Sequence, residues 1–551
     1  MVEATAVNHF EVEQGKAADK VRELAARESV FAVVGPVGSG TSYIAAALEE
    51  ALKQQNYATK IIKARDAIAS WASANSTAIS DGDEVDRVRS LQDAGDKMRE
   101  IDHAAVAVAL IGEIRAERAA QLGRALVDGE PVSPDATPRA YILDSLRHPA
   151  EVHLLRSVYQ DAFCLIGVVC DEERRKERLQ AKFKMETGSA TDKKLGDFIG
   201  RDANAKEKHG QHVADTFHLA DFFIDNTEQR FIEAGAGEVS LHSNPEWTAL
   251  DELARLVDIL THARVQRPRP NEKAMFHAFG AQMRSSCLSR QVGAALMDER
   301  GDIVATGTNE VPRAGGGVYG DVFGERSDID APNGFDHRCF KHGGFCRNTK
   351  EQIAIVEELL GTVPEFAGVV TTPELIGRLR KTRIGQLIEF SRAVHAEMEV
   401  LLSAARQGKA TRGLRLFVTT FPCHNCARHI VAAGVDEVQF IEPYLKSKAL
   451  PLHGDAITTS KIDWVPPSAL STLTTEQLEK RGKAAQVLFR PFTGVAPRLY
   501  RRAFFKDRDL KNNDSGVMLS AFGPPDGVTT SRVSYAHIEA SLQAANSRVA
   551  K

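Results

Sequence analysis

The sequence predicts an α/β protein with two domains, one built on a parallel sheet and one built around a metal site. The first prediction depends on a short apolar run, Val30–Val34, followed by the glycine-rich segment Gly35–Ser42 and a helical pattern. This is the strand, loop and helix order of a phosphate-binding loop. The second depends on the strings HAE at 395–397 and PCHNC at 422–426. The length of 551 residues agrees, because chains of this size split into two or more cores.

The composition excludes several classes of protein. A hydrophobic content of 43% and a charged content of 26% are ordinary for a globular chain, and a net charge of −4 argues against a broadly basic nucleic-acid binder. No apolar run approaches the roughly 20 residues that span a bilayer, and the first residues lack the pattern of a secretory signal. Seven cysteines do not make a disulfide scaffold here. We therefore expect a reducing, cytoplasmic location and cysteines that bind metal.

The glycine-rich segment is expected to bind a nucleotide. Its glycines would let backbone amides approach phosphate oxygens, and Ser42 holds the place of a hydroxyl that ligates magnesium. Thr41 stands where the motif has Lys, which puts phosphoryl transfer in doubt. The candidate nucleotide-binding residues are Gly35, Gly38, Ser39, Gly40, Thr41, Ser42 and Asp144. The alternative is a glycine-rich turn without a ligand.

Further buried strands are predicted at 140–143, 163–169 and 221–226. Asp144 follows the first of them, where its carboxylate could hold Mg²⁺ or a substrate hydroxyl. The charged helix after Asp171 either reaches phosphates or is a solvated surface. This half of the chain resembles a nucleoside-monophosphate kinase. The missing Lys favours a nucleotide-sensing or structural role over a kinase.

The strings at 395–397 and 422–426 match the signature H-x-E…P-C-x-x-C of zinc deaminases that act on nucleobases. His395, Cys423 and Cys426 would fill three corners of a zinc tetrahedron and leave the fourth for water. Glu397 would be the proton shuttle rather than a ligand. We expect a helix over Ser391–Arg406, a strand over 414–420 and a helix over 427–433. A C-x-x-C pair alone could instead be a redox pair or half of a structural zinc site.

The segment 284–296 and the run IVATGTN at 303–309 resemble the deoxycytidylate deaminase family, as do stretches at 442–447 and 453–457. One branch of that family carries an extra N-terminal phosphate-binding-loop domain. The chain is similar to bacterial anti-phage dCTP and dCMP deaminases of that branch. The resemblance implies the three-layer α/β/α cytidine deaminase fold after a kinase-like parallel-sheet domain.

The resemblance also implies which residues bind substrate: Asn309, Ala396, Tyr444 and Arg284. Asn309 would hold the sugar hydroxyl or simply shape a turn, and Tyr444 would stack on the nucleotide or pack in the core. Arg284, Arg290 and Arg392 are candidates to neutralise phosphates, or else structural arginines. The Gly-rich insert Arg313–Thr349 suggests a second, structural zinc. Its candidate ligands are Cys287, His337, Cys339, His342 and Cys346; the alternative is free thiols and surface histidines.

Prolines interrupt a helical pattern near 261–271 and suggest a domain boundary. We expect a nucleotide-kinase-like domain over 1–260, a linker over 261–271, a zinc-dependent deoxycytidylate deaminase domain over 272–500 and a C-terminal extension over 501–551. No chemistry is assigned to the charged segment 81–117.

The sequence therefore predicts a zinc-dependent hydrolase that converts dCTP, dCMP or both to the uracil nucleotide and ammonia. The resemblance to the anti-phage deaminases implies a role in defence against phage. The alternatives are a housekeeping dCMP deaminase, a polynucleotide cytosine deaminase and a regulator with a silent deaminase fold. Expected partners are free deoxycytidine nucleotides, a regulatory nucleotide with Mg²⁺ at the glycine-rich loop, and further copies of the chain. An RNA or protein inhibitor is a further candidate, and no membrane is expected.

Overall fold

The computed structural model describes residues 26–184, 196, 198–202, 209–233, 241–320, 336–363, 372–444, 446–461, 463–472, 485–506, 510–518 and 532–549. Residues 321–335 of the Gly-rich insert therefore lie outside the described residues, as does Leu445 of the stretch 442–447 that resembles the deaminase family. The chain divides into two compact units, Met1–Arg267 with Arg498–Lys551, and Pro268–Pro497. In the described parts, no helix is long and apolar enough to cross a membrane.

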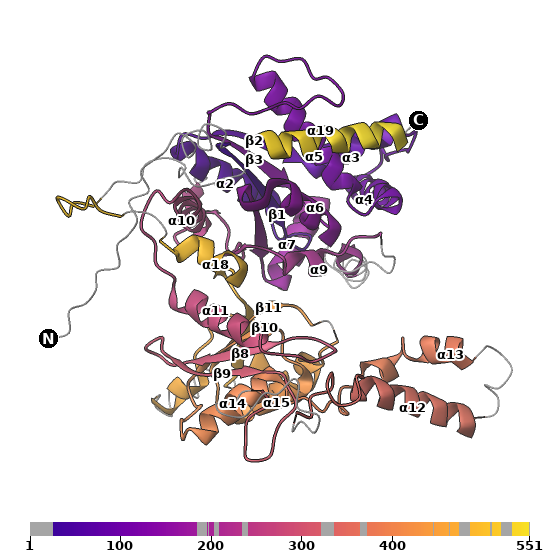
Figure 1. The fold of residues 1–551 in the computed structure, drawn as a ribbon, viewed down its shortest axis with the longest axis vertical. Helices are drawn as coiled ribbons and strands as arrows, with labels where there is room; N and C mark the ends of the chain where they lie inside the picture. The colour runs from indigo at the N-terminus through magenta and orange to yellow at the C-terminus, as the bar shows by residue number, and fades with distance from the viewer. Residues whose placement is uncertain are drawn as a thin grey trace. The chain divides into compact units, whose positions relative to one another are not determined.

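The first unit is built on a sheet of five parallel strands in the order β2-β3-β1-β4-β5 (Figure 1). The strands are β1 (Glu28–Val34), β2 (Ala58–Lys63), β3 (Arg139–Asp144), β4 (Phe163–Val169) and β5 (Phe222–Asp225). Every residue of β3 and β4 is buried, which explains why these strands appear in the sequence as short apolar runs. The central strand β1 places the loops that follow β1 and β3 at the same edge of the sheet.

Helices connect these strands. They are α2 (Thr41–Gln54), α3 (Ala64–Ala74), α4 (Glu84–Ile101), α5 (Ala105–Gln121), α6 (Pro149–Tyr159), α7 (Glu172–Phe183), α9 (Val213–Phe217) and α10 (Ala249–Thr261), with the 3-10 turn η1 (Gln160–Ala162) and a small antiparallel pair, β6 (Phe231–Glu233) and β7 (Leu241–Ser243). Local sequence sets their starts. Asp83 caps α4 by accepting a hydrogen bond from the Asp86 amide, and α6 begins with Pro149 after a capping box of His148 and Glu151.

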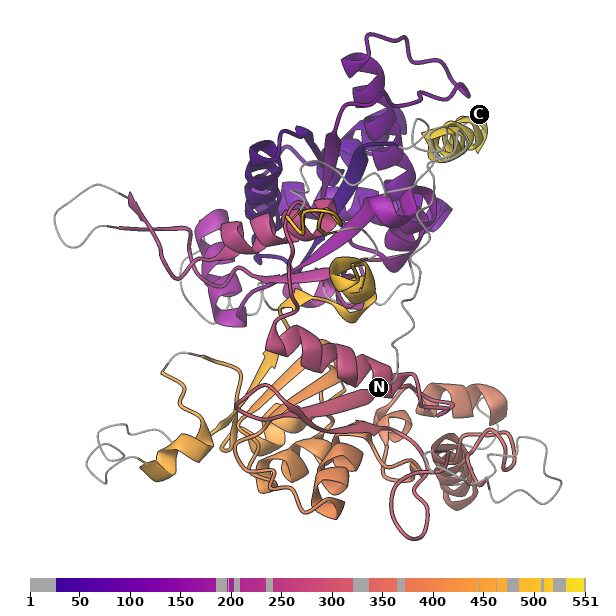
Figure 2. The same cartoon turned by 60° about the vertical axis from the view of Figure 1, so that its left-hand side comes forward.

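The chain returns to the first unit at its C-terminal end. Helix α18 (Pro497–Phe504) leads back, and α19 (Arg532–Val549) packs against α5 and α6 (Figure 2). There Arg118, which is fully buried, forms ion pairs with Glu28 of β1 at 2.8 Å and with Glu539 of α19 at 2.6 Å. The hydroxyl of Tyr535 donates to Glu28 at 2.9 Å. We call these four residues the Arg118 cluster.

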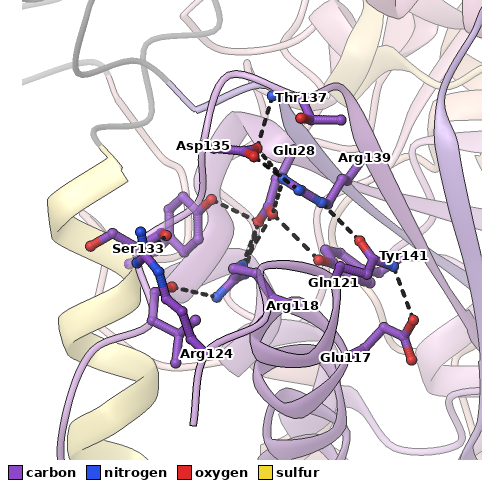
Figure 3. Close-up of polar contacts among 12 residues, drawn as sticks. Glu28, Glu117, Arg118, Gln121, Arg124, Ser133, Asp135, Thr137, Arg139 and Tyr141 are labelled. Carbon is purple, nitrogen blue, oxygen red and sulfur yellow. Dashed lines mark hydrogen bonds and ion pairs between the residues drawn. The ribbon is translucent and has the colours of Figure 1, made fainter. Parts of the chain in front are cut away.

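Further polar side chains surround the Arg118 cluster and bond to it or to one another. Tyr141 of β3 donates to Glu28. Arg139 of the same strand lies beside Glu28 and pairs with Asp135 (Figure 3). Tyr159 of α6 donates to Glu539 at 2.8 Å. Since buried charges are tolerated when each one is paired and hydrogen-bonded, the cluster fixes α19 to the sheet.

The second unit contains a six-stranded mixed sheet in the order β12-β13-β11-β10-β8-β9. Its strands are β8 (Gly293–Met297), β9 (Ile303–Thr308), β10 (Arg415–Thr420), β11 (Glu437–Glu442), β12 (Ile457–Thr458) and β13 (Val487–Pro491), and β14 (Gly494–Val495) follows. Strands β10, β11, β13 and β12 run parallel, whereas β8 is antiparallel to both of its neighbours.

Helices cover both faces of this sheet, with α11 on one and α14 and α15 on the other (Figure 1). The helices are α11 (Pro270–Gln282), α12 (Arg347–Thr362), α13 (Thr372–Leu379), α14 (Ala396–Arg406), α15 (His424–Ala432) and α16 (Ala449–His453), with the turns η3 (Arg383–Gln386) and η4 (Pro467–Thr472). The predicted α/β class with two sheets is confirmed. The likeness of the first unit to a kinase stays a prediction.

One predicted helix starts later than expected. The sequence pattern predicts a helix from Ser391, but α14 begins at Ala396 and His395 is its extended N-cap residue. The reason is a tertiary contact, because Val394 forms an isolated antiparallel bridge with Glu310. His395 therefore lies at the tip of the helix rather than within its first turn.

Candidate functional site

Three of the predicted ligands meet in the second unit. The Nδ1 atom of His395 lies 3.4 Å from Sγ of Cys423 and 3.3 Å from Sγ of Cys426. Ligand atoms of the three side chains all lie within 4.8 Å of one another, and both cysteines are buried. We call these residues the HCC cluster. It is the one group of three or more His, Cys, Asp and Glu residues with this geometry in the part of the chain that the structure describes.

Two helix N-termini position the HCC cluster. His395 is the N-cap of α14, and Cys423 is the N-cap of α15, where its sulfur accepts a hydrogen bond from the Cys426 amide. The strand β10 ends at Thr420, and Pro422 separates it from α15. The exposed amides and the dipole of a helix N-terminus stabilise negative charge there, so both thiolates lie in favourable positions.

The electrostatics of the cluster differ between the two cysteines. Hydrogen bonds from Cys426 and then from His395 lower the pKa of the Cys423 thiol to about 4, and the hydrogen bond to Cys423 raises the pKa of His395 to about 9. The pKa of Cys426 is raised, first by its hydrogen bond to Cys423 and then by burial. A divalent cation would remove this asymmetry, because metal-bound thiols are deprotonated outright.

Glu397 lies next to the cluster on α14 and is 4% exposed. Burial raises its pKa to about 7, against the lowering effect of His395. Its carboxyl also contacts Cys426. Ala396, which lies between His395 and Glu397 in the sequence, is fully buried in the hydrophobic core that includes both cysteines. The structure thus places a carboxyl beside three metal-ligand atoms, as the sequence spacing predicts.

Asn309 uses its whole side chain inside the protein. Its Oδ1 accepts from the Val292 amide at 2.7 Å, and its Nδ2 donates to the Arg290 carbonyl at 2.7 Å. These bonds fix the segment before β8 against the end of β9. They favour the turn-shaping alternative, and the sugar-binding role stays a prediction.

Arg290 and Tyr444 lie together near the HCC cluster. The Arg290 guanidinium is 5.8 Å from the centroid of the Tyr444 ring and 3.2 Å from a carboxylate oxygen of Glu442. Tyr444 packs against the hydrophobic core that contains Cys423 and Cys426, and burial raises the pKa of its phenol. Arg290 keeps 46% of its side chain exposed. Its guanidinium is therefore partly accessible to solvent, and its phosphate-binding role stays a prediction.

The other arginine candidates lie in different surroundings. Arg284 lines a pocket of about 520 Å³ together with Thr306, Ser403 and Arg406, and none of the HCC residues lines it. Arg392 donates to the carbonyl of His337 at 3.0 Å and so ties the insert to the segment that precedes α14. Their phosphate-binding roles stay predictions.

The five candidate ligands of a second zinc do not form a comparable group among the described residues. The rings of His337 and His342 meet edge to face with centroids 5.2 Å apart, whereas Cys346 contacts the hydroxyl of Ser289. Cys287 and Cys339 have free, partly buried thiols. The second zinc therefore stays a prediction without support from this arrangement.

In the first unit, the glycine-rich segment lies between β1 and α2 as expected. Gly38 and Gly40 both adopt a φ of +83°, which favours glycine, and Ser39 is fully buried. The hydroxyl of Ser42 donates to Asp144 Oδ2 at 2.6 Å. The two residues predicted to hold Mg²⁺ are thus brought together, while Thr41 begins α2.

The sequence pattern did not identify Glu310, which bridges Val394, the residue before His395. Glu310 is 2% exposed, and its side chain accepts hydrogen bonds from the amides of Ser286 and Val311, both at 2.9 Å. Ser447 was also missed, and its hydroxyl donates to the Pro422 carbonyl at 2.8 Å. An acidic residue directly after Asn309, at the end of an apolar strand, was the available signal for Glu310.

The donor set of the HCC cluster fits zinc. One imidazole nitrogen and two thiolates are three of the four ligands of a tetrahedral site, and three protein ligands with one open position are typical of catalytic zinc. The burial of both cysteines and the convergence of all three atoms within 4.8 Å agree with a preformed site. No rearrangement of the backbone is needed to gather them.

Comparisons with known proteins agree with this site. Residues 268–442 match the model of the cytidine and deoxycytidylate deaminase zinc-binding region. The deoxycytidylate deaminase of Enterobacteria phage T4 is 29% identical over 207 residues, which are 37% of this chain and 93% of that protein. The ComE operon protein 2 of Bacillus subtilis (strain 168) is 37% identical over 54 residues, 10% of this chain and 29% of that protein.

Among solved structures, the dCMP deaminase from the cyanophage S-TIM5 in complex with dCMP and dUMP is 20% identical, covers 34% of this chain and 90% of its own, and has a TM-score of 0.19. The family-model match over 268–442 includes the HCC cluster and Glu397. In the second unit, the chain is thus similar to the cytidine and deoxycytidylate deaminases.

Proposed function

We propose that the second unit catalyses the hydrolytic deamination of deoxycytidine monophosphate to deoxyuridine monophosphate and ammonia. The observation that carries the proposal is the buried carboxyl of Glu397 beside the three ligand atoms of the HCC cluster. The family match and the phage relatives named as deoxycytidylate deaminases support the choice of substrate.

In this reaction, His395, Cys423 and Cys426 would hold zinc, which lowers the pKa of a water molecule to near neutrality when it is bound. Glu397 accepts the proton of the attacking water and delivers it to ring nitrogen N3. The oxygen of this water bonds to C4, and the same carboxyl then takes the proton of the new C4 hydroxyl and delivers it to the amino group. The C4–N bond breaks, ammonia leaves and a carbonyl remains. The burial of Glu397 keeps bulk water away from these transfers.

The test is ammonia release from dCMP by the purified, zinc-loaded protein, with Glu397→Gln beside wild type. We expect turnover to fall by about 10²–10⁴-fold, the usual size of a general acid–base contribution. Glu399→Gln is the matched control, because Glu399 lies on the same helix but pairs with Arg406. Equal zinc content in all three proteins is required. Full turnover in Glu397→Gln would overturn the proposal.

Finer predictions from the sequence go further. They are dCTP as a second substrate, depletion of deoxycytidine nucleotides in defence against phage, a cytoplasmic location, a homo-oligomer, and a regulatory nucleotide with Mg²⁺ at the glycine-rich loop. Substrate competition between dCMP and dCTP, and nucleotide pools in infected cells that express wild type or Glu397→Gln, test the first two. An RNA or protein inhibitor would be found by co-purification with the catalytically inactive variant.

A further inference from the structure

The glycine-rich segment of the first unit carries a feature that deamination does not use. Asp202 is 1% exposed, and its Oδ2 accepts a hydrogen bond from the Val37 amide at 2.8 Å. Its other oxygen pairs with the guanidinium of Arg147. Arg147 follows β3, whereas Val37 follows β1, so the carboxylate bridges two neighbouring loops at the carboxyl edge of the parallel sheet.

This position is suited to an anion. In open α/β sheets, ligands bind outside the carboxyl ends of the strands, where the connections leave a central strand on opposite sides. The segment Gly35–Ser42 leads into the 14-residue helix α2, and a helix N-terminus together with loop amides attracts negative charge. The carboxylate of Asp202, a residue of the same chain, supplies the negative charge at this place. It thus lies where a phosphate-binding loop would receive its ligand.

Arg147 supplies a cation at a place where the sequence pattern lacks one. Phosphate-binding loops of this spacing carry Lys at the position of Thr41. Arg147 comes from the loop after β3 and contacts the same carboxylate as the Val37 amide. An arginine fork binds carboxylate and phosphate oxygens with similar geometry, so the contacts that hold Asp202 suit a phosphate group equally well.

Packing holds Asp202 in this position. The neighbouring Phe198 is buried against Leu179, and Val37, Phe183 and Ile199 pack on the same small cluster. Arg201 pairs with Asp93 and Asp96 of α4. The helical residues Phe198–Asp202 are thus held near the loop by apolar contacts and against α4 by ion pairs.

We propose that Asp202 occupies the position of a ligand phosphate at the glycine-rich loop, and that a phosphate-bearing ligand binds by displacing it from the Val37 amide and Arg147. Such a ligand has to compete with an intramolecular carboxylate. Only the molecules in which Asp202 is not docked can bind. The apparent affinity of the ligand is therefore lower than its affinity for the undocked form. The inference does not depend on the deamination proposed for the second unit.

The ligand chemistry is a chain of phosphate groups, from either a nucleotide or an inorganic polyphosphate. Isothermal titration of the full-length protein with Mg²⁺ and inorganic tripolyphosphate, and separately with ATP, distinguishes the two sources. We expect Asp202→Asn to bind at least about tenfold more tightly than wild type, and Arg147→Gln at least about tenfold more weakly. Any phosphate subsite in the second unit contributes equally to all variants.

The matched control is Arg124→Gln, which changes an exposed arginine after α5 that donates to the Ser133 carbonyl. It should bind as wild type does. Unchanged or weaker binding by Asp202→Asn would overturn the proposal, as would the absence of binding by both wild type and Asp202→Asn.

Hydrogen–deuterium exchange of wild type provides a second measurement that needs no variant. Displacement of Asp202 predicts faster amide exchange in Phe198–Asp202 when tripolyphosphate is bound. Unchanged or slower exchange in a saturated complex would show that Asp202 stays docked and would overturn the inference, even if Asp202→Asn failed to fold.

Discussion

The backbone carbonyl of Glu310 accepts a hydrogen bond at 3.0 Å from the amide of Val394, the residue directly before the metal-ligand candidate His395. The side chain of Glu310 meanwhile holds the amides of Ser286 and Val311. Glu310 therefore connects three parts of the chain: the end of β9, the segment after α11 and the residues directly before α14. The placement of His395 depends on these three contacts together.

Replacement of Glu310 by Ala should loosen this connection. The amides of Ser286 and Val311 would lose their acceptor, and each buried unsatisfied group costs about 1–3 kcal/mol. We expect a lower free energy of unfolding and faster loss of zinc to a chelator. Urea denaturation and metal analysis check both, with the exposed Glu299→Ala as control. Zinc retention equal to wild type would show that Glu310 does not position His395.

Gly307 of β9 should not tolerate even a methyl group. A Cβ at this position would lie 2.4 Å from the Val400 nitrogen and 2.5 Å from the Ala396 oxygen, both backbone atoms of α14. Gly307→Ala must therefore push α14 away from the sheet, at a cost of about 1–3 kcal/mol for overpacking, and turnover should fall with stability. Gly280→Ala is the control, since nothing lies within 4 Å of its Cβ. Thermal unfolding and zinc content provide the measurements.

Metal content should depend on the HCC cluster alone. We expect Cys426→Ser to lose one zinc per chain and to unfold more readily, because metal binding contributes folding free energy. Cys346→Ser should keep the wild-type zinc content. Native mass spectrometry of the two variants decides the matter. A zinc that is retained in Cys426→Ser and lost in Cys346→Ser would instead establish the second metal site.

Arg290 should recognise the substrate's phosphate. With 46% of its side chain exposed beside Tyr444, it can turn from Glu442 toward a bound nucleotide. Arg290→Gln should raise KM for dCMP by about tenfold or more, the size of one lost charge-assisted hydrogen bond, and leave turnover of deoxycytidine unchanged. Steady-state kinetics on both substrates, with exposed Arg300→Gln as control, test this. Equal losses on the two substrates would contradict the assignment.

The Arg118 cluster should be a major source of stability in the first unit. Glu539→Ala leaves Arg118 buried with one partner fewer, and removal of one member of a buried ion pair costs about 3–5 kcal/mol. Glu177→Ala, which removes an exposed pair with Arg174, should cost at most about 1 kcal/mol. Denaturation curves should show the loss in the first unit, while zinc content stays unchanged. Equal stability of the two variants would remove the cluster from this role.

Local sequence predicted what depends on local physics. Strand β4 has the predicted bounds, because buried strands are continuous apolar runs with clear ends. The HCC cluster was also predictable, since its ligands lie at fixed spacings from two helix starts. The start of α14 was wrong by five residues, because the bridge from Val394 to Glu310 is a contact between distant segments. Asp202 is separated from Val37 by 165 positions, and no periodicity reports such a pair.

The return of α19 to the first unit sets the order in which the protein is completed on the ribosome. Glu28 and Arg118 are synthesised early, but Glu539 follows only after the whole unit Pro268–Pro497 has been made. At about 5–20 residues per second, this delay is on the order of tens of seconds. During it the second unit can fold, while Arg118 has Glu28 but not Glu539 as an ionic partner. The unit that begins first is thus finished last, and translation that stops before Arg532 leaves it without α19.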